Sequence, residues 1–197
     1  MIRSPLNPQR SGSVTARSQS GVRGQRDAVV VPLIQGEIKV SARPLECIST
    51  LLGSCVSVCL FDPETGVGGM NHMLLAGKLL NDPNGIRAST NEIERLINAT
   101  LKAGAVRTNL HAKLFGGAQI TRGLTTVGET NGAFAESYLQ REGIEVDASS
   151  LGGDKARRVH FWPTTGRVKM KFVEDIVVAP PRIPRSVMKD VGDVELF

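Results

Sequence analysis

The stretch of sequence that decides the fold is STLLGSCVSVCLFDPETGVGGMNHMLL, residues 49–75. Its apolar runs at residues 56–61 and 67–75 predict two β-strands. The Asp-Pro-Glu-Thr-Gly segment between them, residues 62–66, is typical of a turn. The stretch therefore predicts a β-hairpin, in which the glycine pair at residues 68–69 favours a bulge.

Pairing of these two strands would bring a cysteine and a histidine together. In an antiparallel pair joined by this turn, the numbers of facing residues sum to about 127 or 128, which places Cys55 opposite His72 or Met73. The β-carbons of facing residues lie ~4.5–5.5 Å apart. A slip of one residue would turn His72 to the other face of the sheet. The hairpin therefore predicts that the two side chains are close, without fixing their alignment.

A thiol beside an imidazole is the minimum equipment for nucleophilic acyl chemistry, because the imidazole can take the thiol proton. Gly53 and Ser54, ahead of Cys55, permit a sharp turn whose exposed amides can stabilise a developing oxyanion. Ser49 and Thr50 lie just upstream, and one of their hydroxyls is expected to hold the imidazole in one tautomer. The sequence leaves open which of the two does so.

The other cysteines and histidines are interpreted as structural. Cys59 follows Cys55 at even spacing and is expected to be a small core residue, and Cys47 has no activating signal nearby. His111 and His160 stand in β-like runs and are expected to be structural or surface residues. The cysteines include no Cys-x-x-Cys pair, so neither a disulfide framework nor a zinc site is expected, and no cofactor is implied.

Composition divides the chain into three parts. Residues 1–27 are a predicted disordered basic arm, residues 28–175 a predicted catalytic domain, and residues 176–197 a Pro-rich tail. Residues 1–26 hold five arginines and no acidic residue, which equals the net charge of +5. The remaining chain is nearly neutral, so composition gives nucleic-acid binding no support. No apolar run reaches the ~20 residues of a membrane span, and the cysteine usage favours a cytoplasmic protein.

The other patterns mix short strands with two helices. Thr90–Ala103 is a predicted helix, with Ser89 as N-cap and Glu92 completing a capping box, and Asn131–Glu142 is a second. The further predicted strands are residues 28–34, 36–40, 112–115, 144–148, 158–162 and 167–173. This order predicts an α/β (α+β) fold, a layered α/β sandwich with mixed, largely antiparallel sheets.

Several separate motifs, in order along the chain, resemble the chemoreceptor glutamine deamidase family, CheD. They are LGSCVSVCLFD (52–62), GGMNHML (68–74), AKLFGGA (112–118), VGETN (127–131), EGIEV (142–146), GGD (152–154), and RRVHF (157–161) followed by TG (165–166). The chain departs from the family pattern at Ser49, where Thr is usual, and at Leu75-Ala76, where Pro is common.

The resemblance implies that Cys55 is the nucleophile, that His72 is its base, and that a hydroxyl at Ser49 or Thr50 completes the site. It implies a protein-glutamine amidohydrolase of chemotaxis adaptation, which converts glutamine side chains of methyl-accepting chemoreceptors to glutamate and ammonia without a cofactor. It also implies, in some systems, contact with a CheC-type phosphatase. Two other functions stay open: a non-catalytic adaptor that binds receptors and the phosphatase, and a general Cys-His acyl hydrolase or methylesterase.

Overall fold

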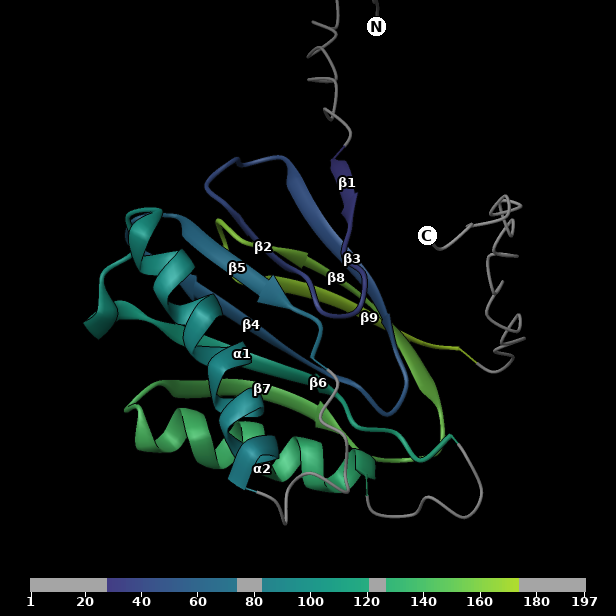
Figure 1. Cartoon of the computed structure of the whole chain (residues 1–197). Helices are drawn as coiled ribbons and strands as arrows, with labels where there is room; N and C mark the ends of the chain where they lie inside the picture. Colours follow the sequence, from purple (N-terminus) through teal and green to yellow (C-terminus); the bar gives the residue numbers. More distant parts are fainter. Residues whose placement is uncertain (1–27, 74–82, 121–126, 174–197) are drawn as a thin grey trace, which may run out of the picture.

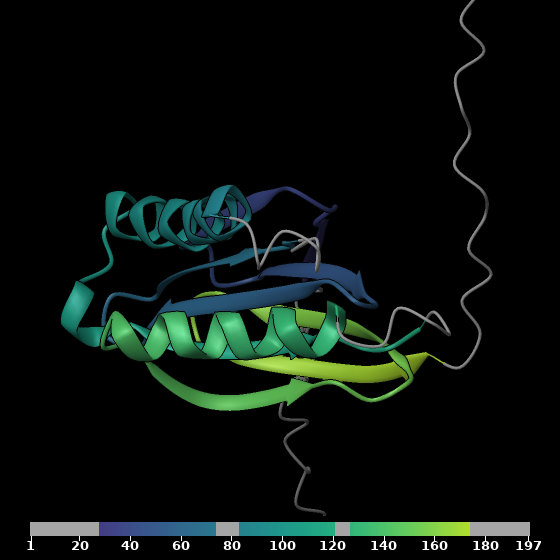
Figure 2. The ribbon, with the colours of Figure 1, turned by 60° about the horizontal axis from the view of Figure 1, so that its bottom comes forward.

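The structure, a computed structural model, describes residues 28–73, 83–120 and 127–173. Helices α1 (Pro83–Lys102) and α2 (Val127–Arg141) lie on one face of a five-stranded sheet (Figure 1). A four-stranded sheet covers the other face of that sheet (Figure 2). Neither described helix is apolar over a long enough stretch to cross a bilayer. The predicted arm and Pro-rich tail lie outside the described residues.

Both sheets are mixed. The five-stranded sheet, called sheet B, has the order β2-β5-β4-β6-β7, and the four-stranded sheet, called sheet A, has the order β1-β3-β8-β9. The strands are β1 (Val29–Pro32), β2 (Ile38–Ser41), β3 (Glu46–Leu52), β4 (Val56–Asp62), β5 (Val67–Asn71), β6 (His111–Gly116), β7 (Glu145–Leu151), β8 (Ala156–Trp162) and β9 (Arg167–Val173), and a short 3-10 helix, η1 (Arg107–Asn109), precedes β6. β1 and β3 are parallel, as are β6 and β7, and the other pairs are antiparallel. The predicted layered sandwich with mixed, largely antiparallel sheets is therefore confirmed.

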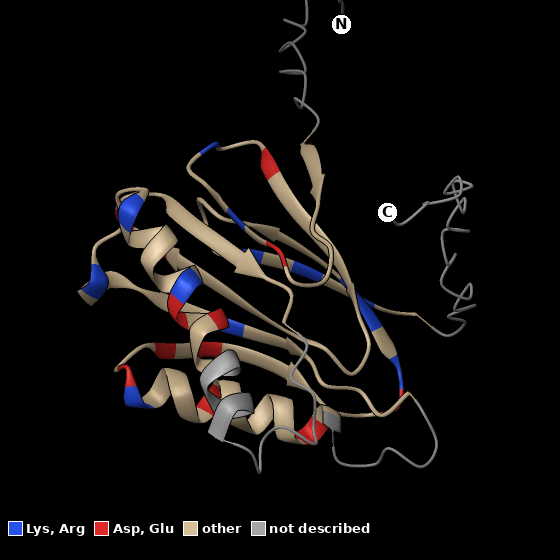
Figure 3. Ribbon diagram, in the orientation of Figure 1, with Lys and Arg blue, Asp and Glu red and all other residues tan. Residues whose placement is uncertain are grey.

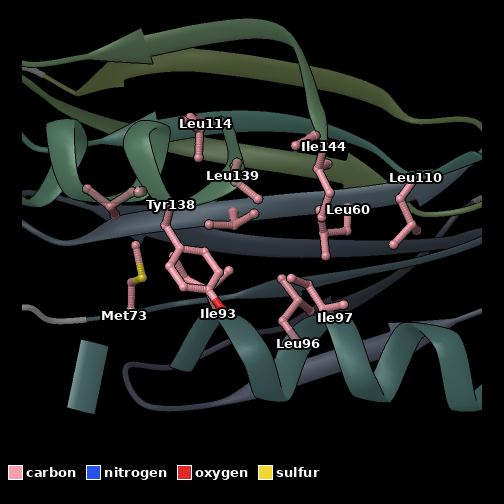
Figure 4. Close-up of a cluster of buried hydrophobic side chains, with 14 of the residues drawn as sticks. Leu60, Met73, Ile93, Leu96, Ile97, Leu110, Leu114, Tyr138, Leu139 and Ile144 are labelled. Carbon is pink, nitrogen blue, oxygen red and sulfur yellow. The ribbon is translucent and has the colours of Figure 1, made fainter. Parts of the chain in front are cut away.

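Strand β4 takes part in two hydrophobic cores. Its side chains alternate between the two faces of sheet B. Val56, Val58 and Leu60 pack into the core beneath the helices (Figure 4), whereas Cys59 and Phe61 pack into the core between the sheets. Because both faces are covered, every residue of β4 is buried, and the strand has the continuous apolar sequence from which it was predicted.

Both helices begin earlier than predicted. The expected apolar positions of α1 do pack against sheet B, but the helix begins at Pro83 and not at Thr90. Ser89 therefore lies inside α1 and is not its N-cap. Proline is compatible with a first helical turn, because its missing N–H would have no partner there. Likewise, α2 begins at Val127 and not at Asn131.

The bulge predicted in β5 is absent, because the pairing of β4 with β5 runs without a register shift from Asp62 and Val67 to Cys59 and Met70. The two glycines instead allow close packing on both faces. A Cβ on Gly68 would lie 2.6 Å from the carbonyl oxygens of Leu60 and Pro163, and one on Gly69 would lie 3.0 Å from Leu96 Cδ1. The end of the predicted strand, residues 74–75, and the departure at Ala76 lie outside the described residues.

The sequence analysis missed β3, the strand that leads into the turn before Cys55. The strand lies inside sheet A, between β1 and β8. Its sequence, ECISTLL, mixes apolar and small polar side chains, which hides the pattern of a buried strand. The other predicted strands are present, with modest differences at their ends.

Candidate active site

Cys55 and His72 belong to the face of sheet B that looks toward sheet A. The numbers of paired residues in β4 and β5 sum to 129, as for Cys59 with Met70, and the isolated bridge between Val56 and Met73 keeps the same sum. The predicted sums of 127 and 128 are therefore wrong, and neither His72 nor Met73 lies directly opposite Cys55. By this register, Cys55 is the diagonal neighbour of His72 on one face, a relation that spans ~7–8 Å between α-carbons.

Both side chains are almost enclosed: Cys55 keeps 9% of its surface exposed and His72 keeps 7%. Burial raises the pKa of the Cys55 thiol to about 11. Burial also lowers the pKa of His72, against the opposing effect of the Leu33 carbonyl. In each case the charged form loses hydration. The resting pair at neutral pH is therefore a thiol and a neutral imidazole, and a proton transfer inside the site must create the thiolate.

Thr50 of β3 orients the imidazole. Its Oγ1 donates a hydrogen bond to the carbonyl oxygen of Leu33 at 2.8 Å and lies 2.9 Å from Nδ1 of His72. A hydroxyl has a single hydrogen, so the second contact needs a donor on the ring, which assigns the proton to Nδ1. Nε2 then keeps its lone pair and is the basic atom of the ring. Of the two hydroxyls that the sequence left open, Thr50 contacts the imidazole.

Ser49 lies on the opposite side of β3, because side chains alternate along a strand. It pairs with His160 of β8. The same side of β3 carries Cys47, whose sulfur lies 3.7 Å from His160 Nδ1. This second thiol–imidazole contact was not expected from the sequence, but Cys47 has no exposed surface and burial raises its pKa. No group of three metal-ligating side chains exists among the residues that the structure describes.

The turn at residues 53–55 is held by its carbonyl groups. They accept hydrogen bonds from the amides of Ala118 (to Gly53, 2.8 Å) and Gly117 (to Cys55, 2.8 Å) and from Nδ2 of Asn131 (to Ser54, 3.0 Å). Within the described ranges, the amides of Ser54 and Cys55 have no acceptor. The turn therefore offers N–H groups to a ligand, as the prediction for Gly53 and Ser54 requires.

Asn131 was missed as a site residue by the sequence analysis, which quoted it only within the VGETN motif. It begins the second turn of α2, is fully buried, and ties that helix to Ser54. Its Oδ1 has no hydrogen-bond partner in the described part of the chain. Gly116 adds to this support, since its φ is 119° and a Cβ there would overlap the carbonyl oxygen of Cys55.

Arg157 fastens the backbone behind this turn. Its guanidinium donates to the carbonyl oxygens of Gly116, Ser150 and Gly152, and the residue is 2% exposed. None of the ion pairs seen among the described residues includes it. Burial accordingly lowers its pKa. Three carbonyl acceptors in place of a carboxylate make Arg157 a structural clamp between the end of β6 and the loop after β7.

Comparison with known proteins gives the family. A family model described as CheD chemotactic sensory transduction matches residues 82–172. A protein of Cereibacter sphaeroides (strain ATCC 17029 / ATH 2.4.9), named probable chemoreceptor glutamine deamidase CheD, is 45% identical over 169 residues, which are 85% of this chain and 85% of that protein. The chain belongs to the CheD family.

Two other CheD proteins bear the same name. The protein of Caulobacter sp. (strain K31) is 46% identical and covers 86% of this chain and 94% of its own length. That of Rhizobium leguminosarum bv. trifolii (strain WSM2304) is 49% identical and covers 71% of this chain and 77% of its own length. Among solved structures, the Neisseria meningitidis protein NMB0706 has a TM-score of 0.40 and 14% identity over 64% of this chain and 63% of that one, a similarity too weak to carry an argument.

In this CheD chain, the site brings together three chemical groups from both sheets. Sheet B supplies the thiol and the imidazole, and sheet A supplies the hydroxyl of Thr50 that fixes the ring proton. The turn before β4 adds amide donors next to the sulfur. A nucleophile, a base of assigned tautomer and an oxyanion site are the parts that acyl transfer needs.

Proposed function

We propose that this chain is a chemoreceptor glutamine deamidase, which hydrolyses glutamine side chains of methyl-accepting chemoreceptors to glutamate and ammonia. The observation that carries the proposal is the hydrogen bond from His72 Nδ1 to Thr50, which leaves Nε2 free on the face that holds Cys55. Membership in the CheD family, whose curated relatives are named for this activity, supports the substrate.

The first chemical step forms a thioester. Nε2 of His72 takes the proton of Cys55 while the sulfur attacks the carboxamide carbon of the glutamine. The amides of Ser54 and Cys55 stabilise the oxyanion of the tetrahedral intermediate, as donors of this kind do elsewhere. The imidazolium then gives its proton to the nitrogen, the C–N bond breaks, and ammonia leaves.

The second step returns the enzyme to its starting state. Water attacks the thioester carbon while His72 takes one of its protons, the C–S bond breaks, and the sulfur is protonated again. The product is a glutamate side chain. The lowered pKa of His72 suits this cycle, because a buried imidazolium is a strong acid toward the leaving nitrogen. Thr50 accepts the Nδ1 hydrogen in both protonation states.

The test is ammonia release from a purified cytoplasmic fragment of a chemoreceptor, with mass spectrometry of the fragment. Each converted glutamine gains about one mass unit, because NH₂ is replaced by OH. We expect Cys55→Ala to abolish both signals. Cys47→Ala is the matched control, since it removes another buried thiol that contacts an imidazole. Undiminished ammonia release by Cys55→Ala would refute the proposal.

The same assay separates the other functions. An adaptor without catalysis predicts that Cys55→Ala restores chemotaxis in a deletion strain. A transglutaminase predicts adducts when a primary amine is added, and a methylesterase predicts methanol from methylated receptor. We further propose, from the family resemblance, that the reaction takes place in the cytoplasm and that a CheC-type phosphatase binds the chain, which co-purification of the two proteins would test.

A further inference from the structure

The outward face of sheet A carries a concentration of positive charge. Side chains of β8 and β9 alternate between the inter-sheet core and the solvent. Val159, Phe161, Val168 and Met170 point into or pack against the core. The outward positions that remain are Arg158, His160 and Trp162 on β8 and Arg167, Lys169 and Lys171 on β9. We call Arg158, His160, Arg167, Lys169 and Lys171 the basic face.

No carboxylate balances the basic face. The outward positions of the other two strands are Val30, Pro32, Cys47, Ser49 and Leu51, all uncharged. The two arginines and two lysines are exposed, and they take part in none of the ion pairs seen among the described residues. Their charge is therefore directed at solvent or at a partner.

Acidic residues gather on the other side of the molecule. Figure 3 shows them in red along the helices and β7, whereas blue dominates β8 and β9. They are Glu92 and Glu94 on α1, Glu129 and Glu136 on α2, and Glu145 and Asp147 on β7. A domain that is nearly neutral by composition thus has separated charges, which composition alone did not predict. Such a separation orients a charged partner as it approaches.

The chemistry of the basic face favours an acidic protein surface. Nucleic-acid binding by stacking needs a free aromatic ring, but Trp162 is partly buried and Arg167 lies over its ring at 4.1 Å. Insertion into a bilayer needs exposed apolar side chains, and the exposed large hydrophobic residue of β8 and β9, Phe172, is on the inward face. Arg167 to Lys171 spans ~14 Å of strand, which matches two turns of a helix bearing carboxylates.

We propose that the basic face docks an acidic, glutamate-bearing helical surface of the receptor, at a place separate from Cys55. The inference rests on the proposed function, because each deamidation converts a neutral glutamine into a carboxylate. Receptor regions that have already reacted are more acidic and bind the basic face more tightly. The enzyme is therefore retained on a receptor that still has unreacted glutamines.

The kinetic test uses the triple variant Arg158→Glu/Lys169→Glu/Lys171→Glu. We expect its KM for the receptor fragment at low salt to rise at least about tenfold, with kcat unchanged. Activity on a short glutamine peptide, too small to reach the face, stays the same. The matched control is Arg95→Glu/Lys102→Glu/Arg141→Glu, which changes the net charge equally on exposed helix positions. We expect the control to keep its KM.

A binding test separates this proposal from the function. Cys55→Ala protein is titrated with two receptor fragments, one with its target glutamines intact and one with them replaced by glutamate. We expect tighter binding of the glutamate form, lost at high salt and in the triple variant. Equal affinities, or binding that the triple variant keeps, would overturn the docking proposal even if wild-type protein releases ammonia. Preferential binding of phosphatidylserine vesicles or of an oligonucleotide to the face would overturn it as well. Absence of ammonia from wild type would refute the function alone.

Discussion

At the scale of single residues, burial moves the pKa values of Cys55 and His72 apart. The thiol pKa rises to about 11 and the imidazole pKa falls, so both groups rest uncharged at neutral pH. A preformed thiolate would react with any electrophile that reached it. A neutral pair instead transfers its proton when a substrate carbonyl is in place. The site therefore combines a reactive atom with low intrinsic reactivity.

This neutral pair predicts the pH dependence of thiol alkylation. Without substrate, the rate of Cys55 alkylation by iodoacetamide should keep rising past pH 9 and level off only near pH 11, because the fraction of thiolate follows the raised pKa. The measurement is mass spectrometry of the Cys55 peptide after timed quenching. The peptides of Cys47 and Cys59 are internal controls, since both side chains are fully buried. A plateau below pH 8 would contradict a neutral pair.

A pair of substitutions distinguishes the adjacent hydroxyls. Thr50→Val keeps the shape of the side chain and removes its hydroxyl, so we expect kcat to fall roughly a hundredfold with little change in KM, because the imidazole loses its fixed tautomer. Thr50→Ser should retain most of the activity. Ser49→Ala is the control, since Ser49 points away from His72. A larger loss in Ser49→Ala than in Thr50→Val would reverse the assignment.

At the scale of elements, the site depends on how α2 and β6 hold the turn before β4. Asn131 of α2 and Gly117 after β6 bind neighbouring carbonyl groups, and these contacts direct the turn's amides toward the sulfur side. We expect Asn131→Ala to lower kcat roughly ten- to a hundredfold while Cys55 alkylation is unchanged, since the nucleophile remains but the oxyanion donors shift. Ser137→Ala, at an exposed position of α2, is the control. Equal losses of kcat and alkylation would indicate general disruption of the site.

The hairpin of β4 and β5 depends on one buried carboxylate. Asp62 accepts hydrogen bonds from the amides of Glu64 and Thr65 in the turn and of Val106 after α1. We expect Asp62→Ala to lower the free energy of unfolding by about 2 kcal/mol or more, because three buried amides lose their acceptor. Urea denaturation measures this change, with Glu64→Ala, an exposed neighbour, as control. An unchanged midpoint would show that water replaces the carboxylate.

At the scale of the whole molecule, the sequence predicts what local patterns encode. The hairpin 56–75 and the amphipathic face of α1 follow from periodicity, and the motifs around Cys55 identified the CheD family. The register of β4 with β5 was missed by one or two residues, because an uninterrupted turn and two tightly packed glycines look like a bulge in the sequence. The choice between Ser49 and Thr50 depends on which way β3 faces, and that strand was not predicted at all.

Charge distribution shows the same limit. Counting residues gave a domain close to neutrality, and the count is correct. The placement of cations on β8 and β9 and of carboxylates on α1, α2 and β7 depends on which strand faces solvent, which is a property of the assembled layers. Surface electrostatics therefore could not be derived before the sheets were assembled.

The division of the site between two sheets has a consequence for biosynthesis. Thr50 is held in sheet A by β8, which emerges from the ribosome long after the cysteine and histidine of sheet B. A nascent chain thus carries its sulfur and its ring well before anything fixes the ring's proton. We expect a growing polypeptide, or one truncated before residue 156, to be chemically silent, so that newly made protein does not attack cellular amides until its last strands have closed the sandwich.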